Sequence, residues 1–211
     1  RVVQGWGTET EIASGIKFDF QAVGSGSESY GLVMNDAWAE NGGLRTLGQS
    51  IPDKSPRAEA GIRLHANALI TFDLTEIRKA GGLPPTQAFV FLSDRAGVND
   101  SALGRAAHIH LLAIVSRATG DAAHKVIAAY VNGVRVEVAF QQGKFAVSGT
   151  IPSPIKANGQ YAKFSVPLPP EAQFVTLVAT GAAGEPGGNP IDSDHAVFSG
   201  ARLEFAAPTV T

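Results

Sequence analysis

The sequence predicts an all-β protein with the fold of an antiparallel β-sandwich or jelly roll. Two observations support this prediction: apolar and polar residues alternate with a period of two over most of the chain, and Gly, Pro, Asn and Asp separate the alternating runs. Helical periodicity is sparse. Because eight to ten short strands follow one another with few helices between them, a sandwich is favoured over a nucleotide-binding α/β sheet.

The first predicted strands lie in the N-terminal half of the chain. Residues 16–23 and 68–74 alternate, and residues 88–92 form a nearly continuous apolar run, which is typical of a strand covered on both faces. A short helix is predicted over residues 75–80. The Gly-Gly pair at 81–82 ends it, because glycine favours the C-terminal cap.

The second half of the chain predicts further strands joined by tight turns. Residues 108–116 form one long strand, and residues 125–140 hold Asn132 and Gly133 between two β-rich runs. This dipeptide favours a type I′ hairpin turn, since both positions accept positive φ. Later strands are predicted over residues 161–168, 174–180 and 196–205.

Composition sets limits on partners and chemistry. The 211 residues are 44% hydrophobic, so the chain can bury a sizeable core. Its net charge is −2 and its basic residues are scattered, so neither nucleic acid nor membrane insertion is expected. The absence of cysteine excludes disulfides and thiolate chemistry. The predicted core comprises Ile62, Leu64, Ile70, Phe72, Phe89, Phe91, Leu111, Ile114, Val175, Leu177 and Leu203.

Three motifs, taken in order, suggest a family. They are GIRLHA at 61–66, GVND at 97–100, and DHA at 194–196 followed by ARL at 201–203. Together they resemble the NPCBM or family 51 carbohydrate-binding modules, which accompany glycoside hydrolases. The resemblance covers residues 30–205 and implies a galactose-binding-domain-like jelly roll.

The resemblance also implies domain organisation and function. Residues 1–27 would be an N-terminal extension or edge strand, and residues 28–207 the sandwich domain. A non-catalytic, extracellular or periplasmic module would tether a larger enzymatic polypeptide to a glycan or oligosaccharide and contact its other domains. Val197 and Phe198 replace the family's Asp-Trp pair. This departure supports an alternative, a structural or interaction sandwich that has lost sugar binding.

Sugar recognition requires an aromatic face for the pyranose and polar groups for its hydroxyls. Trp38 is either a stacking platform or a buried loop anchor. His65 and His195 are either ligand contacts or hydrogen-bonded braces of turns. The resemblance further implies that loop 189–195 lies at one end of the sandwich, that His195 packs near residues 61–66, and that Asp194 orients it. The predicted ligand-binding residues are Trp38, Asn35, Asp36, His65, Asn99, Asp194 and His195.

Two metal sites are conceivable from the residue types. Asp192 and Asp194 suit a structural calcium ion if further oxygens join them, or else form a solvated Asx turn. His108 and His110 alternate on one strand face and with His124 would supply three zinc ligands. No other residue in the sequence is nominated as a fourth.

Catalytic motifs are missing from the sequence. It contains no nucleophile elbow, no zinc-protease helix and no phosphate-binding loop. The remaining enzymatic alternative is a glycosidase carboxylate pair, formed by Asp192 or Asp194 with Glu204. The expectation is therefore a binding module rather than an enzyme.

Overall fold

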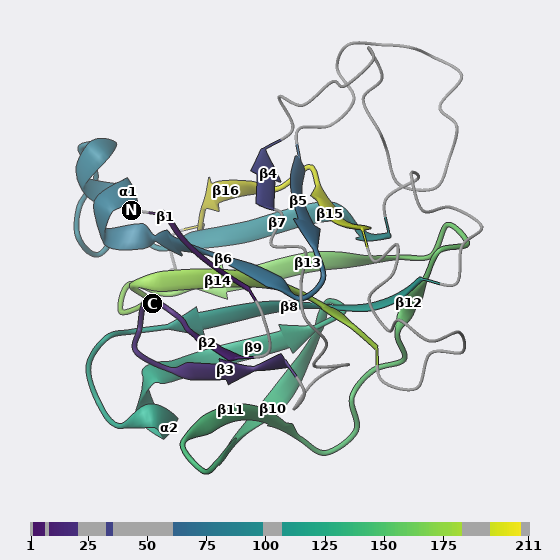
Figure 1. Ribbon diagram of the computed structural model, residues 1–211. Helices are drawn as coiled ribbons and strands as arrows, with labels where there is room; N and C mark the ends of the chain where they lie inside the picture. The colour runs from purple at the N-terminus through teal and green to yellow at the C-terminus, as the bar shows by residue number, and fades with distance from the viewer. Residues whose placement is uncertain are drawn as a thin grey trace, which may run out of the picture.

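The computed structural model describes residues 2–6, 9–20, 33–35, 61–98, 107–182 and 195–207, with only the backbone described for 2–6 and 33–35. Two β-sheets pack face to face (Figure 1), which confirms the predicted β-sandwich. The strands are β1 Val2–Trp6, β2 Glu9–Glu11, β3 Lys17–Asp19, β4 Val33–Asn35, β5 Gly61–His65, β6 Ala68–Asp73, β7 Phe89–Val98, β8 His108–Ser116, β9 Val126–Val131, β10 Val134–Gln141, β11 Lys144–Ser148, β12 Ile155–Lys156, β13 Tyr161–Leu168, β14 Phe174–Gly181, β15 His195–Ser199 and β16 Arg202–Phe205. The helices are α1 Leu74–Ala80 and α2 Ala122–Lys125.

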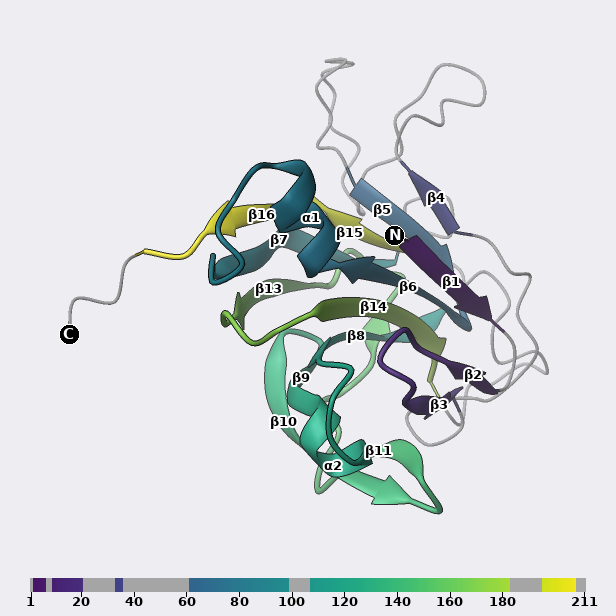
Figure 2. The same cartoon turned by 90° about the vertical axis from the view of Figure 1, so that its left-hand side faces the viewer.

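The larger sheet has the strand order β1-β6-β14-β8-β9-β10-β11-β3-β2, with β12 beside β8. The smaller sheet has the order β13-β7-β15-β5-β4, with β16 beside β7. Strand β10 pairs with β9 through its first residues and with β11 through its last, so the larger sheet curls back beneath its own centre (Figures 1 and 2). The β3–β11 pair is parallel, whereas the other described pairs are antiparallel.

Two hydrophobic cores result from this curl. The first lies between the two sheets, and the second lies between the larger sheet and its own curled end. Eight of the predicted core residues are buried, although Ile114 belongs to the second core. The other three, Ile62, Phe72 and Leu203, pack against the first core but are only partly buried. They are half-buried because they line an open apolar hollow of about 180 Å³ at the edge of the sandwich.

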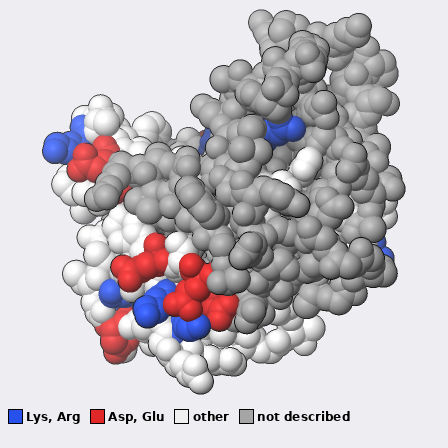
Figure 3. All heavy atoms as spheres, viewed as in Figure 1, with Lys and Arg blue, Asp and Glu red and all other residues white. Residues whose placement is uncertain are grey.

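The N-terminal segment is part of both sheet and core. Strand β1 pairs with β6 as the outermost strand, while β3 lies between β11 and β2. Phe18 is fully buried and stacks on Phe145, with ring centroids 5.4 Å apart. Lys144 on β11 pairs with Glu9 on β2 and with Asp19 on β3. Figure 3 shows acidic and basic side chains intermingled on one part of the surface.

The predicted helix and hairpin are both present. Asp73 caps α1 by accepting hydrogen bonds from the amides of Thr75 and Glu76, which explains why the helix begins at Leu74. Asn132 and Gly133 have φ values of +48° and +80°, as a type I′ turn requires. Neither helix of the described residues is long and apolar enough to cross a membrane.

Strand boundaries show where sequence patterns failed. The run predicted over residues 196–205 divides into β15 and β16 at Gly200, whose φ is +64°. Strands β4, β5, β11 and β12 were not predicted, and β1 and β2 were covered only by the expectation of an N-terminal extension or edge strand. Short strands flanked by turns carry little alternation. The sequence also predicts two long loops rich in Gly and Pro, at 39–60 and 182–194. Apart from Ala182, these residues lie outside the described ranges.

Candidate functional site

The chain crosses from the smaller to the larger sheet at Ala66 and Asn67, between β5 and β6. Asn67 is fully buried, and its Oδ1 accepts a hydrogen bond from the amide of Gly181 at 3.1 Å. The amide of Ala182 in turn donates to the carbonyl of His108 at 2.8 Å. The ends of β5, β14 and β8 therefore meet here, and we call this region the crossing end.

Two histidines lie side by side at the crossing end. Strand β15 pairs antiparallel with β5 so that His195 stands opposite His65, and their ring centroids are 5.0 Å apart at 60°. His65 is only 7% exposed, and its Nδ1 donates to the carbonyl of Ala66 at 2.7 Å. The Nε2 of the neutral ring is then an acceptor. The prediction that His195 packs near residues 61–66 is confirmed.

Arg63 shares this surface, and the sequence analysis missed it. It stands opposite Val197 on β15 and is half-buried. Because side chains of a strand alternate between faces, Arg63 and His65 point to the same side of the sheet, opposite Leu64 in the core. The period of two, counted back from His65, was the signal that would have identified it.

The structure describes only some of the predicted ligand residues. Asn35 stands opposite Ile62, three positions from His65, which is about 10 Å along the strand. Val98, the residue before Asn99 in the chain, stands opposite Ala196. The side chain of Asn35 and the whole of Asp36, Trp38, Asn99, Asp192 and Asp194 lie outside the described residues, so their roles remain predictions.

Val197 and Phe198 occupy buried positions on β15. Phe198 is fully buried between Phe91 and Phe164, with ring centroids at 6.3 and 5.3 Å. Val197 is 4% exposed and packs against Gly61. The side chain at 198 therefore serves the core, so the replacement of a tryptophan by phenylalanine there is a change of core packing.

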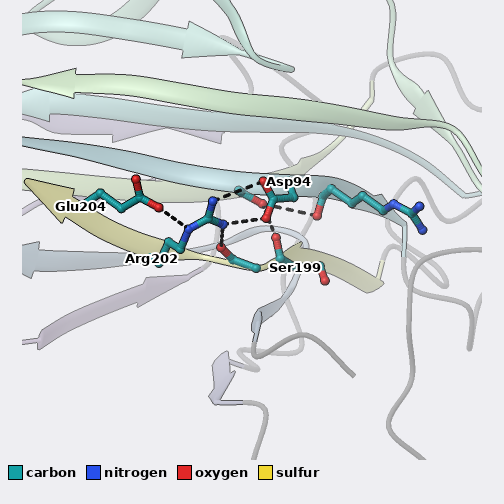
Figure 4. Close-up of polar contacts among 7 residues, drawn as sticks. Asp94, Ser199, Arg202 and Glu204 are labelled. Carbon is teal, nitrogen blue, oxygen red and sulfur yellow. Dashed lines mark hydrogen bonds and ion pairs between the residues drawn. The ribbon is translucent and has the colours of Figure 1, made fainter. Parts of the chain in front are cut away.

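A cluster of charged residues closes the other end of β15 (Figure 4). Arg202 donates through Nη1 to Asp94 at 2.6 Å and to the carbonyl of Gly200 at 3.0 Å, and through Nε to Glu204 at 2.7 Å. The hydrogen bonds to Asp94 and Glu204 raise the pKa of Arg202, and the bond to Asp94 has the larger effect. A Cβ on Gly200 would lie 2.8 Å from a carboxylate oxygen of Asp94, so glycine permits the approach. We call this cluster the arginine clasp.

The position of Glu204 argues against the glycosidase alternative. Glu204 stands opposite Val90 on β7, whereas Ala196, next to His195, stands opposite Val98. Eight residues of strand separate these positions by about 25 Å. Paired glycosidase carboxylates lie about 5–10 Å apart. Glu204 therefore lies far from His195. Because Asp192 and Asp194 lie outside the described residues, their pairing with Glu204 stays a prediction.

The remaining histidines do not converge. His124 lies in α2, at the far end of β8 from His108 and His110, and pairs with Asp121. Burial lowers the pKa of His110 to about 4, so this ring is neutral at pH 7 and its Nδ1 accepts from the Asn132 amide. In the ranges that the structure describes, no three metal-binding side chains come together. The zinc alternative that joined these three histidines is therefore wrong.

Comparison with known proteins gives structural neighbours only. No protein-family model and no curated sequence matches the chain. The family 51 carbohydrate-binding module of Clostridium perfringens GH95, in complex with methyl-galactose, is 16% identical with a TM-score of 0.48, over 97% of this chain and 100% of that one. The tandem family 51 modules of Sp3GH98, a family 98 glycoside hydrolase from Streptococcus pneumoniae, are 18% identical with a TM-score of 0.49.

That second match covers 100% of this chain and 50% of the other. A third neighbour contains the second family 51 module and INT domains of Clostridium perfringens ZmpB, at 14% identity and a TM-score of 0.48 over 98% of this chain and 32% of that one. The chain thus resembles family 51 carbohydrate-binding modules over nearly its whole length. It spans half or less of the two multidomain structures.

Proposed function

We propose that the chain is a non-catalytic carbohydrate-binding module whose glycan site lies at the crossing end. The observation that carries the proposal is the pairing of His195 with His65, at a ring distance of 5.0 Å. This pairing brings together residues of two motifs that lie about 130 positions apart in the sequence. Both motifs belong to the family resemblance.

The chemistry of this surface suits hydroxyl groups. Imidazole nitrogens donate or accept according to tautomer, and the guanidinium of Arg63 on the same sheet face is a fixed set of donors. Both kinds of group pair with the vicinal hydroxyls of a sugar. Loops and strand ends at one end of a sandwich are common binding positions. Asn99 and Asp194 adjoin paired residues of β7 and β15 in the chain, and we propose them as further ligand contacts.

The wider role follows from the same proposal. A module of this kind would hold a larger polypeptide, secreted or periplasmic, against its glycan and would itself perform no chemistry. Trp38 would supply the stacking face, with Asn35 and Asp36 beside it. Asp192 and Asp194 would bind a structural calcium ion if other oxygens complete its shell.

A glycan-array screen with and without calcium tests the proposal. We expect binding to a defined set of glycans by the 211-residue chain, and loss of at least tenfold in affinity for His195→Ala and Arg63→Ala. The matched control is Arg135→Ala, since Arg135 is exposed on β10. Retention of full affinity by both site variants, or absence of any glycan binding, would contradict the proposal.

The role of Asp194 is separable from folding. If Asp194 only braces His195, Asp194→Ala should lower the free energy of unfolding by about 1–3 kcal/mol and leave glycan affinity unchanged. If Asp194 is a pocket residue, as we propose, Asp194→Ala should abolish glycan binding while the melting temperature measured without calcium barely moves. Calorimetric titration and thermal unfolding on the same sample distinguish the two.

A further inference from the structure

A second hollow in the described part of the chain lies beside the edge strand β13 and next to β12, on the side of β7 away from β15. Its volume is about 500 Å³, which is within the usual range of small-molecule sites. Tyr161 of β13 lines the hollow and pairs with Gly97 of β7, and Gly97 pairs on its other side with Val197 of β15. Two strand spacings, about 10 Å, therefore separate Tyr161 from β15.

The walls of the hollow are held by hydrogen bonds. The Oδ1 of Asn132 accepts from the amide of Leu111 at 2.9 Å, and its Nδ2 donates to the carbonyl of Ser153 at 2.9 Å. A Cβ on Gly133 would lie 2.1 Å from the carbonyl oxygen of Lys163, so glycine lets this turn close onto β13. The hollow is thus built before any ligand arrives, which reduces the entropy cost of binding.

Tyr161 provides an aromatic surface within this hollow. It is 45% exposed, and the guanidinium of Arg95 lies 5.4 Å from the ring centroid. A cation over the ring face restrains the ring. Phe205 is the other exposed aromatic side chain of the described ranges, and it lines neither hollow. Exposed tyrosine beside a hollow is an arrangement that binds flat, partly apolar ligands.

The polar groups of the lining are uncharged. Gln160 accepts from the amide of Lys156 through Oε1 at 3.2 Å, which orients its Nε2 donors. Ser153 contributes a hydroxyl and Tyr161 its phenol, whereas no acid or base is among the lining side chains. These groups match sugar hydroxyls, and none of the lining side chains carries a charge that would pair with a charged ligand.

We infer that this hollow binds one neutral pyranose, stacked on the face of Tyr161 that Arg95 leaves uncovered, with hydroxyls bonded to Gln160 and Ser153. It is a site separate from the histidine pair and does not depend on it. A ligand of about a dozen non-hydrogen atoms should bind with Kd of about 1–10 mM.

Fluorine NMR of the chain labelled with 3-fluorotyrosine tests the inference. The sequence has three tyrosines, and the signal of Tyr161 is assigned by its absence from Tyr161→Phe. The probes are methyl β-D-galactopyranoside, methyl β-D-glucopyranoside and N-acetyl-D-glucosamine, each titrated to about 50 mM, well above the expected Kd. We expect at least one to shift the Tyr161 signal saturably while buried Tyr130 stays unchanged.

Variants separate this site from the histidine pair. Saturation-transfer NMR with the same sugar is carried out in the double variant His65→Gln, His195→Gln, so that binding at the histidine pair does not contribute. In that background, Tyr161→Ala should lose at least tenfold in affinity and Gln160→Ala less, and Phe205→Ala, the matched exposed aromatic, should change nothing. The double variant His65→Gln, His195→Gln should keep the Tyr161 shift. A Tyr161 signal that none of the three sugars moves overturns the inference, whether or not glycan binds at the crossing end. A shift at Tyr161 with glycan-array binding unaffected by the histidine variants supports the inference and refutes the proposed function.

Discussion

The two ends of strand β15 carry residues of the same motif stretch but are built differently. At the crossing end, His195 faces a buried histidine at the point where the chain passes between sheets. At the arginine clasp, Arg202 is 41% exposed and donates four hydrogen bonds to Asp94, Gly200 and Glu204. The clasp is a local surface network, whereas the crossing end joins strands of both sheets.

The difference between the two ends shows that residues matching one family motif can have different roles. Ala201, Arg202 and Leu203 match the family pattern as well as Asp194, His195 and Ala196 do. Yet the donors of Arg202 are bonded within the protein, so that part of the motif maintains a turn. A matched residue is a ligand candidate only when the fold brings it to a surface with other motifs, as the β5–β15 pairing does.

The largest expected effect lies between the two ends, at Phe198. Phe198→Ala removes a fully buried ring that contacts Phe91 and Phe164, so the free energy of unfolding should fall by about 3–5 kcal/mol. Chemical denaturation measures it. Phe205→Ala is the control, because Phe205 is 64% exposed and its removal should cost little. Equal losses for the two variants would show that the buried ring of Phe198 contributes no more to stability than an exposed one.

The second effect is a pH dependence at the crossing end. Burial lowers the pKa of His110 to about 4, whereas the unfolded chain has about 6.5. Above pH 6.5 the His110 ring is neutral in both the folded and the unfolded protein, so the free energy of unfolding is not reduced by this group. As the pH falls from 6.5 to 4, only the unfolded state takes it up, so stability falls by about 3 kcal/mol and then levels off.

Denaturation of the protein and of His110→Gln between pH 7 and pH 4 checks this expectation. The difference between the two curves isolates His110 from the carboxylates that titrate in the same range. Parallel curves would mean that His110 takes up its proton at the same pH in the folded protein as in the unfolded chain.

A third, smaller effect concerns Asn67. Asn67→Ala deprives the amide of Gly181 of its acceptor in a buried place, so the free energy of unfolding should fall by about 1–3 kcal/mol. Asn158→Ala is the matched control, since Asn158 accepts from Gln160 in an exposed turn. If both variants lose the same stability, the link between β5 and β14 contributes nothing beyond an ordinary turn.

Periodicity predicted the sandwich and most of its long strands, because alternation reports burial on one face of a sheet. It did not predict the second core. Phe18 and Phe145 lie in short strands and Phe20 directly follows one. Their burial depends on the curl of β10, a long-range feature that no local pattern encodes. The histidine pair followed from the order of the motifs. The Tyr161 hollow did not, because it requires the pairing register of strands. Arg63 was missed although the period of two, counted back from His65, would have identified it.

The smallest effect is expected at the arginine clasp. Arg202→Ala breaks ion pairs whose partners are more than half exposed, where water and salt screen the attraction, so the melting temperature should hardly change. Arg202→Lys should behave the same way, although it loses the paired contacts with Asp94. Thermal unfolding at low and high salt is the measurement, with Asn67→Ala alongside. A loss for Arg202→Ala that matches Asn67→Ala and persists in high salt would make the clasp an equal anchor of β15, and the contrast between the two ends would fail.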